Sequence, residues 1–157
     1  IPKRDWSSDV CSSDLLLSLA TQRSNAVLAA QLTADHLRCF GRVAANATPV
    51  SASDVQATLD RRYGWDVRVP PGSETQGLQL IEGRRRLMLY GGIPHLLYRA
   101  HGEDVSLFIL PGEERAAADL TTFGHRARIW SRGGNTYVLV SSAPLTDVAA
   151  YVQKQAN

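Results

Sequence analysis

The spacing of the apolar residues changes at Trp65, and this change constrains the fold more than any other feature. Upstream, apolar side chains such as Leu28 and Leu32 recur at helical spacing, which predicts a helix over residues 24–43. A second helix is expected from Ser53, which with Gln56 resembles a capping box, to a glycine cap at Gly64. Downstream, short apolar runs separated by turn residues predict strands over residues 65–69, 78–81, 87–90, 93–99, 105–110, 126–131 and 136–141.

The order of these segments predicts the fold class. The sequence RGGN at residues 132–135 is the clearest hairpin turn, and Glu82-Gly83 and Gly91-Gly92 are further expected turns. A short outer helix is expected over residues 113–120 and a closing helix over residues 145–155. Because most strands follow one another without a crossover helix, we expect an α+β fold: N-terminal helices, an antiparallel β-meander and a C-terminal helix.

The first fifteen residues look foreign to the rest of the chain. Residues 5–15, DWSSDVCSSDL, look like a translated sequencing-library adapter, and such joins are set aside before a fold is considered. We therefore expect residues 1–15 to be a non-native artefact. Residues 16–46 are then the remnant of a membrane helix and a juxtamembrane helix, and residues 47–157 a globular domain.

The apolar segment LLLSLA at residues 15–20 has three interpretations. It can be the outer end of a membrane helix, the end of a signal-peptide core with Ser18 and Ala20 near a cleavage site, or the apolar first turn of a soluble helix. Six residues are too few to decide among them, since a spanning helix needs about 20 apolar residues. The first two interpretations place the domain outside the cytoplasm.

Charge and cysteine content exclude some classes of protein. The formal net charge of +2 is too small for a nucleic-acid-binding face, and Arg84-Arg85-Arg86 is expected to be a solvated turn between strands. At face value Cys11 and Cys39 could form one disulfide bond. If Cys11 belongs to the artefact, Cys39 is alone and the chain has no disulfide framework.

His36 and Cys39 are the candidate metal ligands. Three residues apart on a helix, they lie on one face, and imidazole with thiolate suits zinc or copper. Further ligands would come from His95, His101 or His125. The alternative is that Cys39 is a small buried residue of the helix core and His36 lies at its edge. Zinc or copper is thus the only cofactor for which the sequence offers residues.

We expect no enzymatic activity and no catalytic residue. A Cys39 nucleophile oriented by Asp35 or Asp104 can be drawn, but no local signature of a cysteine hydrolase surrounds Cys39. The glycines lack the spacing of a phosphate-binding loop. The large residues on the expected strands are typical of a core, with an aromatic groove for a peptide or lipid as the alternative: Trp65, Tyr98, Phe108, Trp130 and Tyr137.

From Gly77 to the end, the sequence resembles the extracytoplasmic domain of transmembrane anti-sigma factors of Gram-negative-type bacteria. The matching segments are GLQLIEGR at 77–84, LLYR at 96–99, VSLFILP at 105–111, GHRARIW at 124–130 and RGGNTY at 132–137. The segment ADHLRCF at 34–40 also resembles the region just outside the membrane in some members. These are spaced strand and turn residues and not a catalytic signature.

The resemblance implies a regulator of transcription whose cytoplasmic N-terminal domain, often zinc-binding, holds a sigma factor inactive. That domain would precede a single membrane helix, so its sigma-binding and zinc-ligand residues correspond to no position in this sequence. The implied location is the bacterial inner membrane, with this domain in the periplasm and an envelope protein or small signal as a further partner. Direct nucleic-acid binding is not expected. The alternatives are a secreted or periplasmic metal-binding module using His36 and Cys39 and, more remotely, a cysteine-dependent hydrolase.

Overall fold

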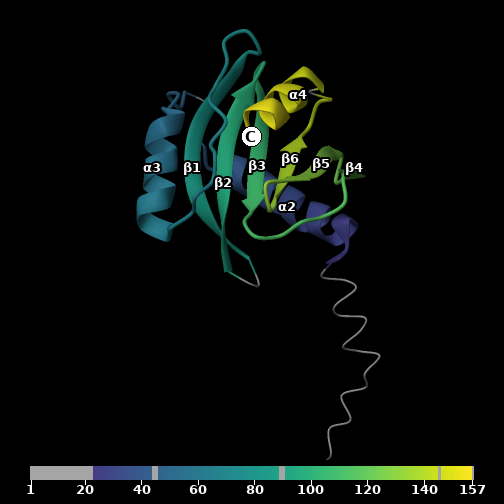
Figure 1. Ribbon diagram of the computed structural model, residues 1–157. Coiled ribbons are helices and arrows are strands. Elements are labelled where there is room, and N and C mark those ends of the chain that lie inside the picture. The colour runs from purple at the N-terminus through teal and green to yellow at the C-terminus, as the bar shows by residue number, and fades with distance from the viewer. Residues whose placement is uncertain (1–22, 44–45, 89–90, 145, 157) are drawn as a thin grey trace, which may run out of the picture.

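The computed structural model describes residues 23–43, 46–88, 91–144 and 146–156 (Figure 1). Residues 1–22, which include the adapter-like segment and the LLLSLA segment, lie outside the described residues. The elements follow in the order α2 (Asn25–Phe40), α3 (Ala52–Tyr63), β1 (Leu78–Met88), β2 (Gly91–Ala100), β3 (Glu103–Leu110), β4 (Ala118–Thr122), β5 (His125–Arg132), β6 (Asn135–Ser141) and α4 (Thr146–Gln155). The expected α+β class, with helices before and after an antiparallel sheet, is confirmed.

The sheet consists of two antiparallel meanders joined side by side. The strand order is β1-β2-β3-β6-β5-β4, and every neighbouring pair is antiparallel. The two meanders meet where β3 pairs with β6, with Val105 opposite Ser141 and Leu110 opposite Thr136. The strands β2, β3, β6 and β5 are therefore paired along both edges, and β1 and β4 are the edge strands.

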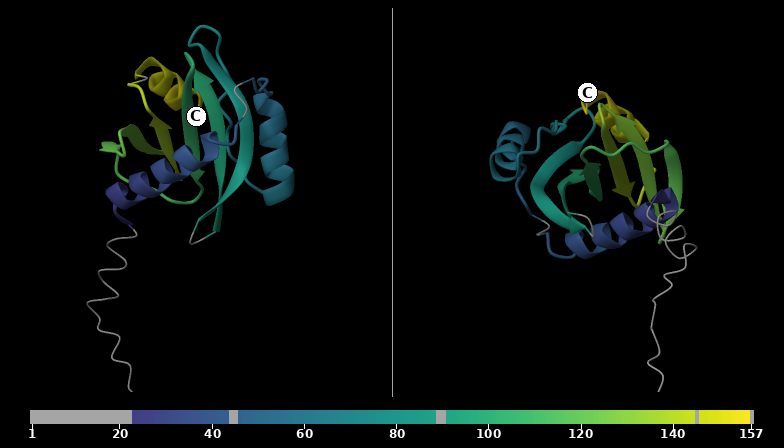
Figure 2. Two further views of the ribbon diagram at one scale, coloured as in Figure 1. Left: turned by 180° about the vertical axis from the view of Figure 1, so that it is seen from behind. Right: turned by 60° about the horizontal axis from the view of Figure 1, so that its bottom comes forward.

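Helices cover both faces of this sheet. In Figure 2 (left), α2 crosses one face diagonally, with Leu28, Ala29 and Leu32 buried against strand residues such as Phe108 and Val138. The other face is covered by α3, α4 and the segment before β1, whose Leu59, Val67 and Val152 share one core with Leu96 and Leu107. As a result, residues 93–98 and 105–110 are buried at every position. No helix in the described part of the chain is long and apolar enough to cross a membrane.

The first two helices begin and end close to the expected positions. The Ser24 side chain caps α2, accepting a hydrogen bond from the Val27 amide at 3.4 Å. Gly64 ends α3 in the left-handed conformation, at φ 65°, as the glycine cap requires. The expected Ser53–Gln56 capping box is absent: the N-cap of α3 is Ser51, and Gln56 instead accepts a hydrogen bond from the Val69 amide at 3.0 Å.

Three expected elements differ from the structure. Residues 78–81 and 87–90 were expected as two strands, but one continuous strand, β1, runs through the anticipated Glu82-Gly83 turn, with a bulge between Leu80 and Glu82. Arg84, Arg85 and Arg86 are consequently strand residues and not a turn. The helix expected over residues 113–120 is absent, because its end forms β4, which pairs with β5. Residues 65–69 form no strand, although Val67 and Val69 are buried as alternation predicts.

Candidate functional site

The inner face of α2 changes character along its length, and its C-terminal half forms the candidate site. In the first half the buried residues are apolar: Leu28, Ala29 and Leu32. In the second half they are mostly polar, namely Thr33, Asp35, His36 and Cys39. Buried polar side chains are uncommon unless they have partners, so this half of the interface needs an explanation beyond packing.

Ser106 joins two buried histidines. Its hydroxyl lies 2.9 Å from His36 Nδ1 on α2 and 2.9 Å from His95 Nε2 on β2. The hydroxyl can donate only one hydrogen bond, so at least one ring nitrogen donates to it if both bonds form. His95 is fully buried and stacks on Phe108 with ring centroids 4.0 Å apart. The Ser106 hydroxyl therefore links α2 to β2 and β3 through one chain of hydrogen bonds.

Both histidines are held in the neutral form. The pKa of His36 is lowered to about 4, first by burial and then by the charge of His125, whose ring centroid is 5.1 Å away. The pKa of His95 is lowered to about 3, first by burial and then by the positive charges of Arg84, His36 and Arg86. Because burial penalises the charged imidazolium, protonating either ring would destabilise the contact between α2 and the sheet.

An ion pair fixes the other flank of this half of α2. Arg86 on β1 makes two hydrogen bonds to the Asp35 carboxylate, one of them from Nε to Oδ2 at 2.7 Å. This carboxylate raises the pKa of Arg86 despite the opposing effect of burial. A bidentate arginine–carboxylate pair fixes both the distance between α2 and β1 and the position of α2 along that strand.

Some polar atoms in this interface have no partner. Thr33 Oγ1, His95 Nδ1 and Arg84 Nη2 are buried and make no hydrogen bond with the described part of the chain. Each such atom costs about 1–3 kcal/mol relative to a satisfied one. The C-terminal half of α2 is thus held by specific polar contacts but less favourably than the apolar half.

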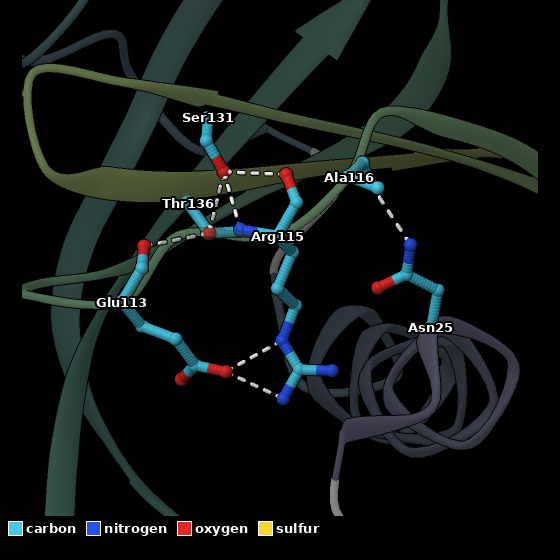
Figure 3. A network of polar contacts seen from close by, with 6 residues as sticks. All are labelled: Asn25, Glu113, Arg115, Ala116, Ser131 and Thr136. Atoms are coloured by element: carbon cyan, nitrogen blue, oxygen red, sulfur yellow. Dashed lines mark hydrogen bonds and ion pairs between the residues drawn. The ribbon is translucent and has the colours of Figure 1, made fainter.

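The start of α2 is fastened separately (Figure 3). Asn25 Nδ2 donates a hydrogen bond of 2.9 Å to the carbonyl of Ala116 in the loop between β3 and β4. That loop is held in turn by Ser131, which bonds the Arg115 amide at 2.7 Å, and by Thr136, which donates to the Glu113 carbonyl at 2.7 Å. These contacts hold the first turn of α2 at the β5–β6 hairpin.

The predicted metal ligands, His36 and Cys39, lie on the same helix face. His36 and Cys39 are both buried, and Cys39 is a free thiol. His95 and His125 lie near His36, whereas His101 lies in the β2–β3 turn beside Gly77. Among the described residues, no three His, Cys, Asp or Glu side chains are arranged to hold a metal ion. The geometry therefore gives the zinc or copper prediction no support.

The two carboxylates drawn as orienting groups for a Cys39 nucleophile are both paired with arginines. Asp104, one of the two candidate orienting groups, pairs with Arg99 at the β2–β3 turn, whereas the other, Asp35, is occupied by Arg86. Sequence reasoning did not single out Ser106, which is central to the observed cluster. One signal was present: Ser106 is the single hydroxyl residue within the apolar run VSLFIL, which is buried on both faces.

Comparisons with known proteins add little to this picture. No protein-family model matches the chain, and no curated protein matches it. Seven chains of solved structures match, among them one from the complex structure of Pseudomonas aeruginosa MucA/MucB. That match has 19% sequence identity and a TM-score of 0.39, and it covers 51% of this chain and 30% of the other. The chain thus spans less than a third of the protein it matches.

Proposed function

We propose that this chain is the periplasmic domain of a membrane-anchored anti-sigma factor, a regulator of transcription whose sigma-binding part lies upstream. The observation that carries the proposal is the placement of α2. This helix follows the apolar segment at residues 15–20 and packs across the whole sheet through an apolar half and a polar half. A change in the domain that displaces α2 would pass along the chain toward a membrane segment.

The sequence resemblance supports the same role. Its segments at 77–84, 96–99, 105–111, 124–130 and 132–137 fall on β1, β2, β3, β5 and the β5–β6 hairpin. The segment ADHLRCF at 34–40 supplies Asp35 and His36, which bind the sheet from α2. The residues that carry the resemblance are therefore those that build the sheet and attach α2 to it, as expected for a domain whose task is to hold or release this helix.

The native gene upstream of residue 15 provides the direct test. We expect a soluble segment followed by one apolar helix long enough to span a bilayer. Alkaline phosphatase fused after Asn157 of that full-length protein should be active, and β-galactosidase at the same site inactive. Co-expression with the sigma factor encoded beside it should repress a sigma-dependent reporter. A short basic leader ahead of a cleavable apolar core would refute the proposal.

The metal-binding alternative is separated from this role by titration. Zn(II) and Cu(I) are added to the purified chain and to a His36→Ala/Cys39→Ala variant, with circular dichroism as the check on folding. Stoichiometric binding that the variant loses would favour a periplasmic metal-binding module. Equal weak binding by both proteins would remove that alternative.

A further inference from the structure

One end of the sheet, here called the basal end, gathers exposed cations and exposed apolar side chains. The end of β1 and the start of β2 lie at this end, since Met88 pairs with Gly91, and so do the end of β3 and the start of β6. The last turn of α3 lies there too, because Arg85 of β1 stands over the Tyr63 ring. The first turn of α2 is at the same end through the bond from Asn25 to Ala116 (Figures 1 and 2).

Two glycines, Gly83 and Gly92, leave the space in which α3 and Arg85 lie close to the sheet. A Cβ on Gly83 would lie 2.1 Å from Val55 Cγ1, so the missing side chain lets α3 lie directly on β1. A Cβ on Gly92 would lie 2.1 Å from Arg85 Nε, so Arg85 lies across the neighbouring strand. Its guanidinium carbon then stands 5.5 Å from the centroid of the Tyr63 ring, a cation–π contact. Arg85 is therefore held in place beside the last turn of α3.

The surface formed in this way is both basic and apolar. We define the basal patch as Arg61, Arg62, Tyr63, Arg85 and Leu87. Leu87 is 68% exposed and Tyr63 36%, and all three arginines are exposed. Within the described part of the chain, none of these arginines forms an ion pair with an acidic side chain. Exposed apolar residues beside unpaired arginines are not explained by the folding of the domain itself.

The basal end also carries acidic residues. Glu113 there is bound to Arg115, Glu114 lies beside it, and exposed Asp60 and Asp66 flank the end of α3. The three patch arginines outnumber the two carboxylates beside them, so the patch keeps a positive charge that a negatively charged surface would attract.

We propose that the basal patch docks the domain onto the surface of an anionic phospholipid bilayer. Arginines bind lipid phosphates, tyrosine favours the membrane–water interface, and Leu87 can enter the boundary of the acyl chains. The basal end also carries the start of α2, through which the chain reaches its membrane segment, and this part of the argument rests on the proposed function. Docking would hold the sheet still while α2 alone is free to move.

Vesicle binding tests the proposal on the full 157-residue chain. The patch variant is Arg61→Glu/Arg62→Glu. Its matched control is Arg42→Glu/Arg126→Glu, which makes the same charge change at exposed arginines outside the patch. Each protein is sedimented with vesicles of phosphatidylcholine alone or with about one third phosphatidylglycerol. Because each arginine near an anionic surface contributes about 1 kcal/mol, we expect at least about tenfold weaker binding for the patch variant and no loss for the control.

A second variant tests the apolar part of the patch. Leu87→Ser should weaken binding to the anionic vesicles by a few-fold and leave its salt dependence unchanged, because no charge is altered. Thermal unfolding by circular dichroism shows whether each variant is folded. The proposal would be overturned if the wild type bound neutral vesicles as well as anionic ones, or if both patch variants kept wild-type binding. In either case the apolar residues 15–20, which are intact in every protein, would account for the binding. Binding of polyglutamate in place of vesicles would make the patch a protein-docking site.

These outcomes are independent of the test of the regulatory role. The vesicle assay contains no sigma factor and no upstream domain, so a loss of vesicle binding leaves the reporter result untouched. Conversely, the chain could bind anionic vesicles through the basal patch but fail to repress the reporter. The docking proposal would then stand, and the proposed anti-sigma role would be refuted.

Discussion

At the scale of single residues, the protein places neutral histidines where a charge would be most costly. His36 and His95 share the Ser106 hydroxyl, and neither has room for solvent, with exposed fractions of 3% and 0%. Sequence spacing singled out His36, on one helix face with Cys39, as a candidate metal ligand. It could not identify Ser106 or Arg86 as partners, because these contacts join residues 70 and 51 positions apart.

The lowered pKa values predict that acid destabilises the fold. Above an unfolded-state pKa of about 6.5 both histidines are neutral in both states, and their contribution is complete. As the pH falls, the unfolded chain binds protons first, so stability is lost until the folded pKa values of about 4 and about 3 are reached. Between pH 7 and pH 4.5 we expect urea denaturation to show a loss of about 2 kcal/mol or more per histidine.

Matched variants separate this effect from the titration of the carboxylates. His36→Gln/His95→Gln should flatten the decrease in the free energy of unfolding between pH 7 and pH 4.5. His101→Asn, in the exposed β2–β3 turn, should leave the decrease as it is in the wild type. An unchanged pH dependence in the double variant would show that the two buried rings do not control acid stability.

At the scale of elements, the glycine cap of α3 and the RGGN hairpin were predicted well, whereas the Ser53–Gln56 capping box, the continuous strand β1 and the strand β4 were not. Gly64 and the RGGN turn act through local backbone geometry, so the sequence shows them directly. The strand β4 replaces an expected helix because pairing with β5 outweighs the local preference of an alanine-rich segment. The turn expected at Glu82-Gly83 is absent because Gly83 serves the approach of α3 and not a change of chain direction.

The apolar half of α2 should carry most of the energy that holds the helix. Leu32 is fully buried, whereas Leu37 on the same helix is 48% exposed. Leu32→Ala should lower the free energy of unfolding by about 2–5 kcal/mol, since it removes buried methyl groups and leaves a cavity. Leu37→Ala, the same change on the outer face, should alter it by less than about 0.5 kcal/mol in the same denaturation experiment. Equal losses would place Leu37 in a contact that the described residues do not show.

The contact between α3 and β1 predicts a rescue between two positions. Gly83→Ala should destabilise the fold by about 1–3 kcal/mol, because its new methyl group overlaps Val55. Adding Val55→Ala should recover part of this loss, giving a coupling energy above about 0.5 kcal/mol in a double-mutant cycle. Gly41→Ala is the control, since a Cβ there meets nothing closer than 3.8 Å. Strictly additive losses would contradict direct packing of α3 on Gly83.

At the scale of the whole molecule, the sequence predicted the fold class but not the order of the strands. Local alternation identifies strands and hairpins, whereas the pairing of β3 with β6 joins two separate meanders. That pairing places β3 and β6 at the centre of the sheet, and His95 and Ser106 lie buried where α2 crosses the strands. The candidate site is therefore produced by the tertiary fold. Residues of α2, β1, β2 and β3 contribute to it, and the spacing along the chain could bring together only those of α2.

If α2 transmits the state of the domain, a substitution that weakens the attachment of α2 should change regulation more than one that destabilises the domain elsewhere. Leu32→Ala weakens the attachment of α2, and Leu59→Ala creates a cavity under α3 on the opposite face, both at positions no more than 1% exposed. In the full-length native protein, we expect Leu32→Ala to change sigma-dependent reporter output severalfold. Leu59→Ala should lower the free energy of unfolding by a similar amount but change the reporter output much less. Immunoblots must show equal levels of the two variant proteins for this comparison. Equal effects of both variants would mean that the reporter follows overall stability and that α2 has no separate role in transmission.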